Sequence, residues 1–268
     1  MSDQKEFQLV KFTNRPTGEI VRDVLALHRM WKSGALGGEH MPEDVHPDLP
    51  ADSPLLLHYL TLGMCLNYQR NSYKLWEACT SAYDTEADRW VFDPMVVCSS
   101  GEDQLREVLV RHRIALQPNK HVGNWYRLCG GIVQFGDGDV RNILKQNSYD
   151  IDLVRSFIQE NRKFFPYLAG NKICNYWLYV LWQYTSLPIS NKEALTVAPD
   201  THVINASVRL GLLSIDDAAA SNAQERCVLA WDDILKNTSF APIDIHTPLW
   251  LWSRLKFPSI DVSLTKDR

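Results

Sequence analysis

Apolar residues recur along most of the chain at three- and four-residue intervals, which is the spacing of a helix that buries one face. The clearest examples are Leu105, Val108, Leu109 and Ile114, and then Val203, Ile204, Val208 and Leu210. No segment alternates convincingly in the manner of a strand, and we find no internal repeat. The pattern therefore predicts an all-α fold of about nine to twelve helices.

Capping residues, prolines and glycines mark where these helices begin and end. Pro54 and Pro248 suit a first helical turn, because the backbone N–H that proline lacks has no partner there, and Gly211 suits a helix end. The segment between 34 and 54 is rich in glycine, proline and acids and predicts a long loop. The expected helices are 19–32, 54–70, 72–83, 101–116, 119–135, 139–145, 150–164, 171–184, 201–211, 216–236 and 246–255.

Composition narrows the class of protein. Hydrophobic residues make up 45% of the 268 residues and charged residues 22%, as in a folded globular chain. No apolar run approaches the roughly 20 residues of a membrane helix, and the first twelve residues carry charges where a signal peptide needs an apolar core. We therefore expect a soluble intracellular protein without a membrane partner, large enough for two helical lobes with a groove between them.

The cysteines, the histidines and the net charge do not predict a metal site or a strongly basic protein. The closest of the six cysteines, Cys65 and Cys79, are 14 residues apart, and the histidines form no HExxH motif. We expect no metal, no cofactor and cysteines that are small buried hydrophobic residues. The net charge of −4 argues against a strongly basic, nonspecific nucleic-acid binder. It is compatible with a protein that contacts a few phosphates through backbone amides.

The segment from 150 to 213 carries the candidate chemistry. A helix is followed by a turn that contains Gly170 and by a second helix that starts at once. We expect Gly170 to adopt a positive φ and to let a phosphate approach the backbone. The amides of Asn171, Lys172 and Ile173 would then be donors at a helix N-terminus, which favours anions.

Asp200 lies where the N-cap of the next helix belongs. On its own it is most simply a capping residue, and Lys172 on its own is most simply a solvated lysine. Their local sequences change this interpretation. Residues 167–172 read YLAGNK, and residues 197–203 read VAPDTHV and continue into RLGL at 209–212.

These two segments resemble the helix-hairpin-helix (HhH-GPD) DNA glycosylase superfamily, in the group of endonuclease III and 8-oxoguanine glycosylase. In that superfamily the hairpin reads roughly L-P-G-V-G-x-K and a V-P/A-V-D-T-H segment follows it. Here Tyr167 and Leu168 replace the usual proline and glycine, and the interval from Lys172 to Asp200 is longer. The archaeal 8-oxoguanine glycosylases, which this chain resembles most, have a comparably stretched hairpin region.

Two further segments fit the resemblance, which covers about residues 54–255. Residues 66–72, LNYQRNS, are similar to the glutamine-containing helix end that faces the extruded base. Residues 118–139, which end in FGDGD, are similar to the region with an F-G-G-D helix end. The resemblance implies a glycosylase-like domain at 54–268, with the hairpin at about 150–185 and a base-binding cleft between two lobes. Residues 1–53 would be an N-terminal extension of unassigned role.

The resemblance also implies a function and a set of site residues. The chain would be a DNA N-glycosylase with β-lyase activity on abasic sites, acting as a monomer on duplex DNA with a damaged or modified base, 8-oxoguanine first. Asp200 would be the catalytic carboxylate and Lys172 the nucleophile. Gln69 would contact the base, and Gly170, Asn171 and His202 the DNA backbone. The protein would be cytoplasmic or associated with the nucleoid, or nuclear in a eukaryote.

Two alternatives remain open from the sequence. The same fold could hydrolyse a free modified nucleoside or nucleotide, which the acidic net charge favours. It could also be a helical DNA-binding protein that keeps the hairpin without catalysis.

Overall fold

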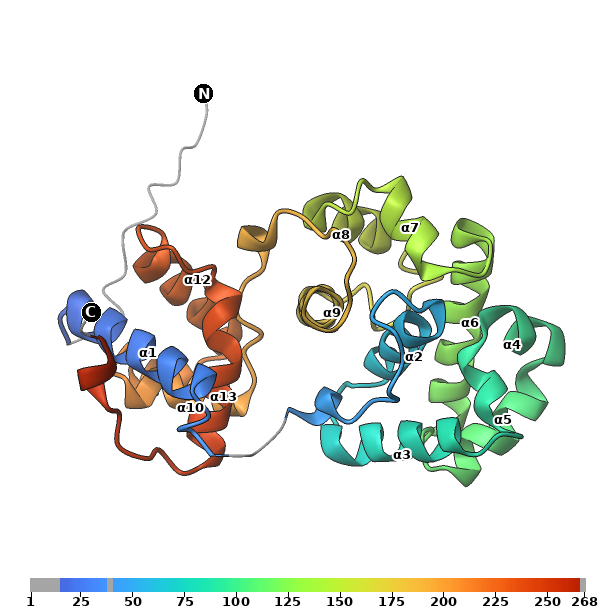
Figure 1. The fold of residues 1–268 in the computed structure, drawn as a ribbon, viewed down its shortest axis with the longest axis horizontal. Coiled ribbons are helices and arrows are strands. Elements are labelled where there is room, and N and C mark those ends of the chain that lie inside the picture. Colours follow the sequence, from blue (N-terminus) through green and yellow to red (C-terminus); the bar gives the residue numbers. More distant parts are fainter. Residues whose placement is uncertain (1–14, 38–40, 266–268) are drawn as a thin grey trace. The chain divides into compact units, whose positions relative to one another are not determined.

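The protein is all-α, as the hydrophobic pattern predicts. A computed structural model describes residues 15–37 and 41–265, and Figure 1 shows their helices. These residues form thirteen α-helices and five short 3-10 helices. They contain no strand, and the only β-type pairing among them is an isolated bridge between Asp150 and Ser190.

The chain divides into two compact units, and the division is not sequential. Unit 1 combines Met1–Glu39 with Thr196–Arg268, and unit 2 is His40–Leu195. Residues 17–32, which the sequence interpretation placed in an N-terminal extension, are thus a helix of unit 1.

Unit 1 is built around the contact between α10 (Thr201–Arg209) and α13 (His246–Arg254). Helix α1 (Thr17–Lys32) packs on α13 as well. The indole of Trp231 is fully buried and donates a 2.8 Å hydrogen bond to Ser207 Oγ on α10. The helices of this unit are α1 (Thr17–Lys32), α10 (Thr201–Arg209), α11 (Ile215–Ala219), α12 (Ala223–Leu235), η4 (Pro242–Ile245), α13 (His246–Arg254) and η5 (Val262–Thr265).

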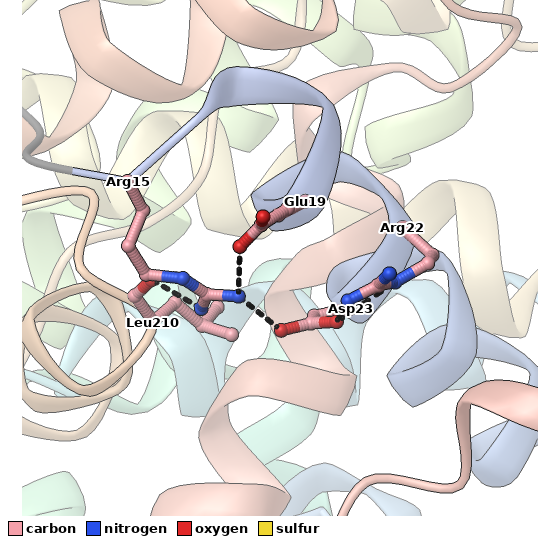
Figure 2. Close-up of polar contacts among 5 residues, drawn as sticks. All are labelled: Arg15, Glu19, Arg22, Asp23 and Leu210. Carbon is pink, nitrogen blue, oxygen red and sulfur yellow. Dashed lines mark hydrogen bonds and ion pairs between the residues drawn. The ribbon is translucent and has the colours of Figure 1, made fainter.

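Arg15 ties the start of α1 to the end of α10, as Figure 2 shows. Its Nη1 donates to the carbonyl of Leu210 at 2.8 Å, and its Nη2 donates to Asp23 Oδ2 at 2.8 Å. Gly211 follows with a φ of +79°, and a Cβ there would lie 2.8 Å from Arg15 Cδ. Gly211 therefore ends α10 as predicted, and it also leaves space for the arginine.

Unit 2 is built around α2 (Pro54–Cys65), because every residue of this helix from 56 to 65 is buried. Helices α6, α7 and α9 pack on α2, and Trp177 of α9 donates to Thr61 Oγ1 at 3.0 Å. The helices of this unit are η1 (Pro42–Asp44), α2 (Pro54–Cys65), α3 (Ser72–Asp84), η2 (Arg89–Phe92), α4 (Pro94–Ser100), α5 (Glu102–Arg111), α6 (Pro118–Gly136), α7 (Val140–Gln146), α8 (Ile151–Glu160), α9 (Asn171–Tyr184) and η3 (Lys192–Ala194). Among the described residues, no helix is both long and apolar enough to span a membrane.

The helix boundaries differ from the prediction in several places. Three helices end four or five residues earlier than predicted: α2 at Cys65 rather than 70, α5 at Arg111 rather than 116, and α8 at Glu160 rather than 164. The sequence interpretation overlooked α4, which Asp93 caps by accepting from the amides of Met95 and Val96. Gly101, with a φ of +86°, then separates α4 from α5. The predicted helix 216–236 is two helices, α11 and α12, and the described residues hold thirteen α-helices rather than nine to twelve.

Candidate active site and nucleic-acid interface

The predicted hairpin is present in unit 2, but its turn has a different conformation from the one expected. Residues 161–170 connect α8 to α9, and these two helices contact each other. The residue with a positive φ is Tyr167, at +61°, whereas Gly170 has a φ of −72°. The prediction of a positive φ at Gly170 is therefore wrong.

The close packing of the turn explains why residue 170 is a glycine. The amide of Gly170 donates to the carbonyl of Tyr167 at 2.9 Å. A Cβ on residue 170 would lie 3.1 Å from the same carbonyl oxygen, which is tighter than ordinary contact. The glycine thus suits the close approach of two backbone segments, and it does not adopt an unusual φ.

The first turn of α9 is suited to an anion. Gly170 is its N-cap and supplies no side-chain hydrogen bond to the helix. Gly170 and Asn171 are exposed, and Asn171 Oδ1 accepts from Gln159 at 2.9 Å. The amides at such a helix start carry partial positive charge, so this end of α9 can hold a phosphate.

Lys172 is the second residue of α9 and is half-buried. The indole of Trp177, five residues further along α9, is buried against α2. The residue one turn after Lys172 is Tyr176, whose hydroxyl donates to Glu43 Oε1. Glu43 is only 1% exposed, and its burial raises the pKa of its carboxyl group to about 7. The helix that carries Lys172 is therefore in contact with a buried carboxyl group whose pKa is raised.

The loop that carries Gln69 lies against the hairpin turn. The ring centroids of Tyr68 and Tyr167 are 5.3 Å apart, and the thiol of Cys65 lies 3.6 Å from the carbonyl oxygen of Pro166. Gln69 itself is exposed and has a φ of +50°. The structure therefore brings the predicted base-contacting loop next to the predicted backbone-binding turn within one unit.

The start of α6 also lies against the hairpin turn. The segments that meet here differ in charge from the whole chain. Lys120 Nζ lies 5.0 Å from the ring centroid of Tyr167. The three segments that meet here belong to sequence stretches without any Asp or Glu: 53–76, 108–136 and 161–192. Their Lys and Arg residues are Arg70, Lys74, Arg111, Arg113, Lys120, Arg127, Arg162, Lys163, Lys172 and Lys192. The charge is therefore unevenly distributed along the sequence of the chain.

Asp200 occupies a well-defined position in unit 1. It is the N-cap of α10, and its Oδ1 accepts from the amide of Val203 at 2.9 Å. Its Oδ2 accepts from Trp250 Nε1 on α13, also at 2.9 Å. The carboxylate is half-buried. It is therefore held by two N–H donors, while each oxygen keeps a further lone pair for another interaction.

Trp250 also organises the surroundings of His202. The His202 ring meets Trp250 edge to face at 5.2 Å, and His202 Nδ1 lies 3.2 Å from Ser253 Oγ. The guanidinium carbon of Arg254 lies 5.1 Å from the Trp250 ring centroid. The sequence analysis did not predict the link between Trp250 and Asp200. No local pattern in the sequence indicates this link, because the two residues lie 50 positions apart.

The predicted site residues thus fall into two groups. Gly170, Asn171 and Lys172 lie together in unit 2 beside the loop of Gln69, and Asp200 and His202 lie together in unit 1. The roles assigned to them, and a cleft between the two lobes, stay predictions. Among the described residues, no group of three or more His, Cys, Asp or Glu side chains is arranged to hold a metal ion. The six cysteines are free, and all but Cys98 are buried.

The fold and the hairpin define an all-α protein of the helix-hairpin-helix kind. No family model matches the chain, and the curated proteins include no match. Among solved structures, the chain is similar to endonuclease III in a trapped covalent intermediate with DNA, an estranged-adenine complex. The TM-score is 0.53 at 15% sequence identity, over 89% of this chain and 86% of that one. At this identity the similarity defines the fold.

Proposed function

We propose that this protein is a DNA N-glycosylase with β-lyase activity, which removes a damaged or modified base. The observation that carries the proposal is that the hairpin turn next to Lys172 contacts the loop of Gln69 and Lys120 of α6, in stretches of sequence without Asp or Glu. The similar fold of endonuclease III, which was trapped covalently on DNA, supports the same reaction class.

Phosphate binding follows from this surface. A duplex carries one negative charge about every 1.7 Å along its axis, and Lys and Arg side chains gain affinity by displacing its counterions. The uncapped start of α9 adds backbone donors at Asn171 and Lys172. The stretches of sequence that contribute to this surface hold ten Lys and Arg residues and no Asp or Glu.

Lys172 would be the nucleophile of the reaction. A stacked base is inaccessible, so the nucleotide must leave the helix before its glycosidic bond breaks. Neutral Lys172 Nζ attacks C1′, the C1′–N bond breaks, and the base departs with the bonding electrons and takes up a proton. The sugar ring then opens to give a protonated Schiff base with the lysine.

Asp200 would act on the same sugar as an anion. Positive charge develops on the deoxyribose as the base departs, and a fixed carboxylate stabilises that charge. The hydrogen bonds from Val203 and Trp250 set the orientation of Asp200 in advance. We further propose duplex DNA as the substrate, 8-oxoguanine as the first base to test, a monomeric enzyme and a compartment that contains DNA.

The direct experiment is incubation with a set of lesion-bearing oligonucleotides, scored for base release and for covalent trapping by borohydride. Wild-type protein should release at least one base and form a trapped adduct. Lys172→Gln should lose the adduct and still bind DNA. Lys163→Gln, an exposed hairpin lysine, is the matched control because it removes one positive charge from the same segment. Trapping that survives in Lys172→Gln would exclude Lys172 as the nucleophile.

Asp200 is tested by a variant that keeps the helix cap. Asparagine is as good an N-cap as aspartate, so Asp200→Asn should fold and lose base release by a factor of 100 or more, as expected for removing a fixed charge (about 3 kcal/mol). Asp93→Asn is the control, because Asp93 caps α4 in the same way. Equal activity of both variants would leave Asp200 with a capping role only.

Two outcomes would overturn the proposal as a whole. Release of bases from free nucleosides without salt-dependent binding to DNA would identify a nucleoside hydrolase. Salt-dependent DNA binding without base release from any lesion would identify a noncatalytic DNA-binding protein.

A further inference from the structure

Three left-handed residues lie in the segments of unit 2 that meet at the hairpin turn. Gln69, Arg113 and Tyr167 have φ values of +50°, +60° and +61°. This conformation is uncommon for residues other than glycine, and for a bulky residue such as tyrosine it is a clear outlier. Such strain persists only where the surrounding structure enforces it, and it is typical of ligand sites.

Hydrogen bonds hold the strained segments together. Arg70 Nη1 donates to the carbonyl of Ile114 at 2.7 Å, and its Nη2 donates to the carbonyl of Arg113 at 3.3 Å. The loop of Tyr68 is thereby fixed to the turn before α6, while Tyr68 itself meets Tyr167 of the hairpin. The cluster is thus a fixed arrangement of three loops from distant parts of the sequence.

This arrangement presents aromatic surface to solvent. Tyr68 is 45% exposed, and its ring is tilted by 35° to that of Tyr167 at a centroid distance of 5.3 Å. Lys120 Nζ lies 5.0 Å from the Tyr167 ring centroid. The ring of Tyr68 and part of the half-buried Tyr167 are therefore accessible to a ligand.

Aromatic faces beside cations are suited to one class of ligand. Nucleobases stack on exposed aromatic side chains, and the phosphates next to each base are bound by Lys and Arg. No Asp or Glu occurs in the three segments that form the cluster. An acidic peptide would fit the charge but would supply no planar ring for each anionic group, so a nucleic-acid strand fits better.

We propose that Tyr68 and Tyr167 form a stacking platform for an unpaired nucleobase, with Lys120 bound to a phosphate beside it. The inference rests on the proposed function and deepens it, because it defines the DNA that this site selects. A base in an intact duplex is stacked on its neighbours and cannot reach the platform. The protein therefore prefers DNA in which a base has lost its partner or its stacking.

The test uses an oligonucleotide duplex with 2-aminopurine, a fluorescent base, either opposite an abasic-site analogue or opposite thymine. Wild-type protein should bind the unpaired form more tightly and quench its fluorescence. Tyr68→Ala should weaken binding of the unpaired form about tenfold, because one stacked base loses its aromatic partner, and leave the paired form unchanged. Tyr68→Phe should restore both affinity and quenching.

Further variants separate stacking from charge and from folding. Tyr167→Asn removes the ring but suits a left-handed residue, so it should fold and behave like Tyr68→Ala. Lys120→Gln should weaken both duplexes alike and reduce the salt dependence of binding by about one unit. Trp31→Ala is the matched control, because this half-buried ring in unit 1 lies 4.1 Å from Lys32 Nζ and should leave binding unchanged.

The outcomes distinguish the two proposals. If folded Tyr68→Ala and Tyr167→Asn bind the unpaired form as tightly as wild type, the platform is excluded, and base release from a lesion still decides the glycosylase function separately. If wild-type protein binds neither duplex, the platform is excluded, and base release from a lesion again decides the glycosylase function separately. If the variants lose base release with unchanged binding, stacking is excluded and the tyrosines act at another step.

Discussion

Trp250 donates a 2.9 Å hydrogen bond to the carboxylate of Asp200, which lies 50 residues earlier in the chain. The other carboxylate oxygen caps α10 by accepting from Val203. The contact between α10 and α13 thus fixes the side chain on which the proposed chemistry depends, while leaving it half-buried rather than enclosed. The last α-helix, α13, thus positions Asp200 at the start of α10.

Trp250→Phe should remove this positioning and leave the packing of α13 largely intact. We expect a loss of about 1 kcal/mol in the free energy of unfolding, as for a typical hydrogen bond, and a larger loss of base release. Trp252→Phe is the matched control, since its indole donates to the carbonyl of Pro258 at 2.7 Å instead. Urea unfolding should show similar losses for both variants, and only Trp250→Phe should impair base release. Equal base release by the two would contradict the positioning role.

The local parts of the fold could be predicted from the sequence, and the long-range parts could not. Asp200 is the N-cap of α10 as predicted, because the side chains that cap helices are recognisable within a few residues. The partner of its second oxygen was missed, because no local pattern indicates where an indole 50 residues away will point. The contact between Tyr68 and Tyr167 was missed for the same reason.

The turn of the hairpin shows a second limit. A glycine suggests a positive φ, but Gly170 is required by its approach to the carbonyl of Tyr167, and the tyrosine takes the left-handed conformation. Sequence propensity alone could not distinguish these two reasons for a glycine. Helical periodicity likewise predicts that 17–32 is a helix, but not that it joins 196–268 in one unit.

Gly211→Ala should destabilise the protein for two separable reasons. Its φ of +79° is unfavourable for alanine, by about 1 kcal/mol, and its new Cβ would displace Arg15. Gly34→Ala is the control, because Gly34 has a φ of +77° and no atom within 4 Å of the added Cβ. The difference between the two variants in thermal unfolding then measures the displacement of Arg15. That difference should vanish in an Arg15→Ala background, and its persistence there would contradict the explanation.

Alanine at two helical glycines should change the free energy of unfolding in opposite directions. A Cβ at Gly63 in α2 would lie 2.7 Å from the buried ring of Trp76, whereas a Cβ at Gly130 in α6 meets nothing within 4 Å. We expect Gly63→Ala to destabilise by about 1–3 kcal/mol through overpacking. Gly130→Ala should stabilise by about 0.5–1 kcal/mol, because alanine is the better helix former. Urea midpoints that shift in the same direction would contradict the close contact at Gly63.

Glu43 should make the stability of the protein depend on pH between about 4.5 and 7. Burial raises the pKa of this carboxyl group from 4.5 to about 7 in the folded protein. Between these two values the folded state keeps a proton that the unfolded state has released. The free energy of unfolding should therefore fall as pH rises through this window, by at most about 3 kcal/mol at 1.36 kcal/mol per pKa unit, and then level off above pH 7.

Glu43→Gln isolates this effect, because glutamine cannot ionise but still offers an oxygen to the hydroxyl of Tyr176. The variant should match wild type near pH 4.5 and exceed its stability at pH 8. Asp232, whose pKa burial raises to about 6, adds a slope of the same sign to both proteins. The difference between the two urea-unfolding profiles therefore reports Glu43 alone. Parallel profiles from pH 4.5 to 8 would show that Glu43 does not hold its proton, and that its contact with Tyr176 on the helix of Lys172 is insensitive to pH.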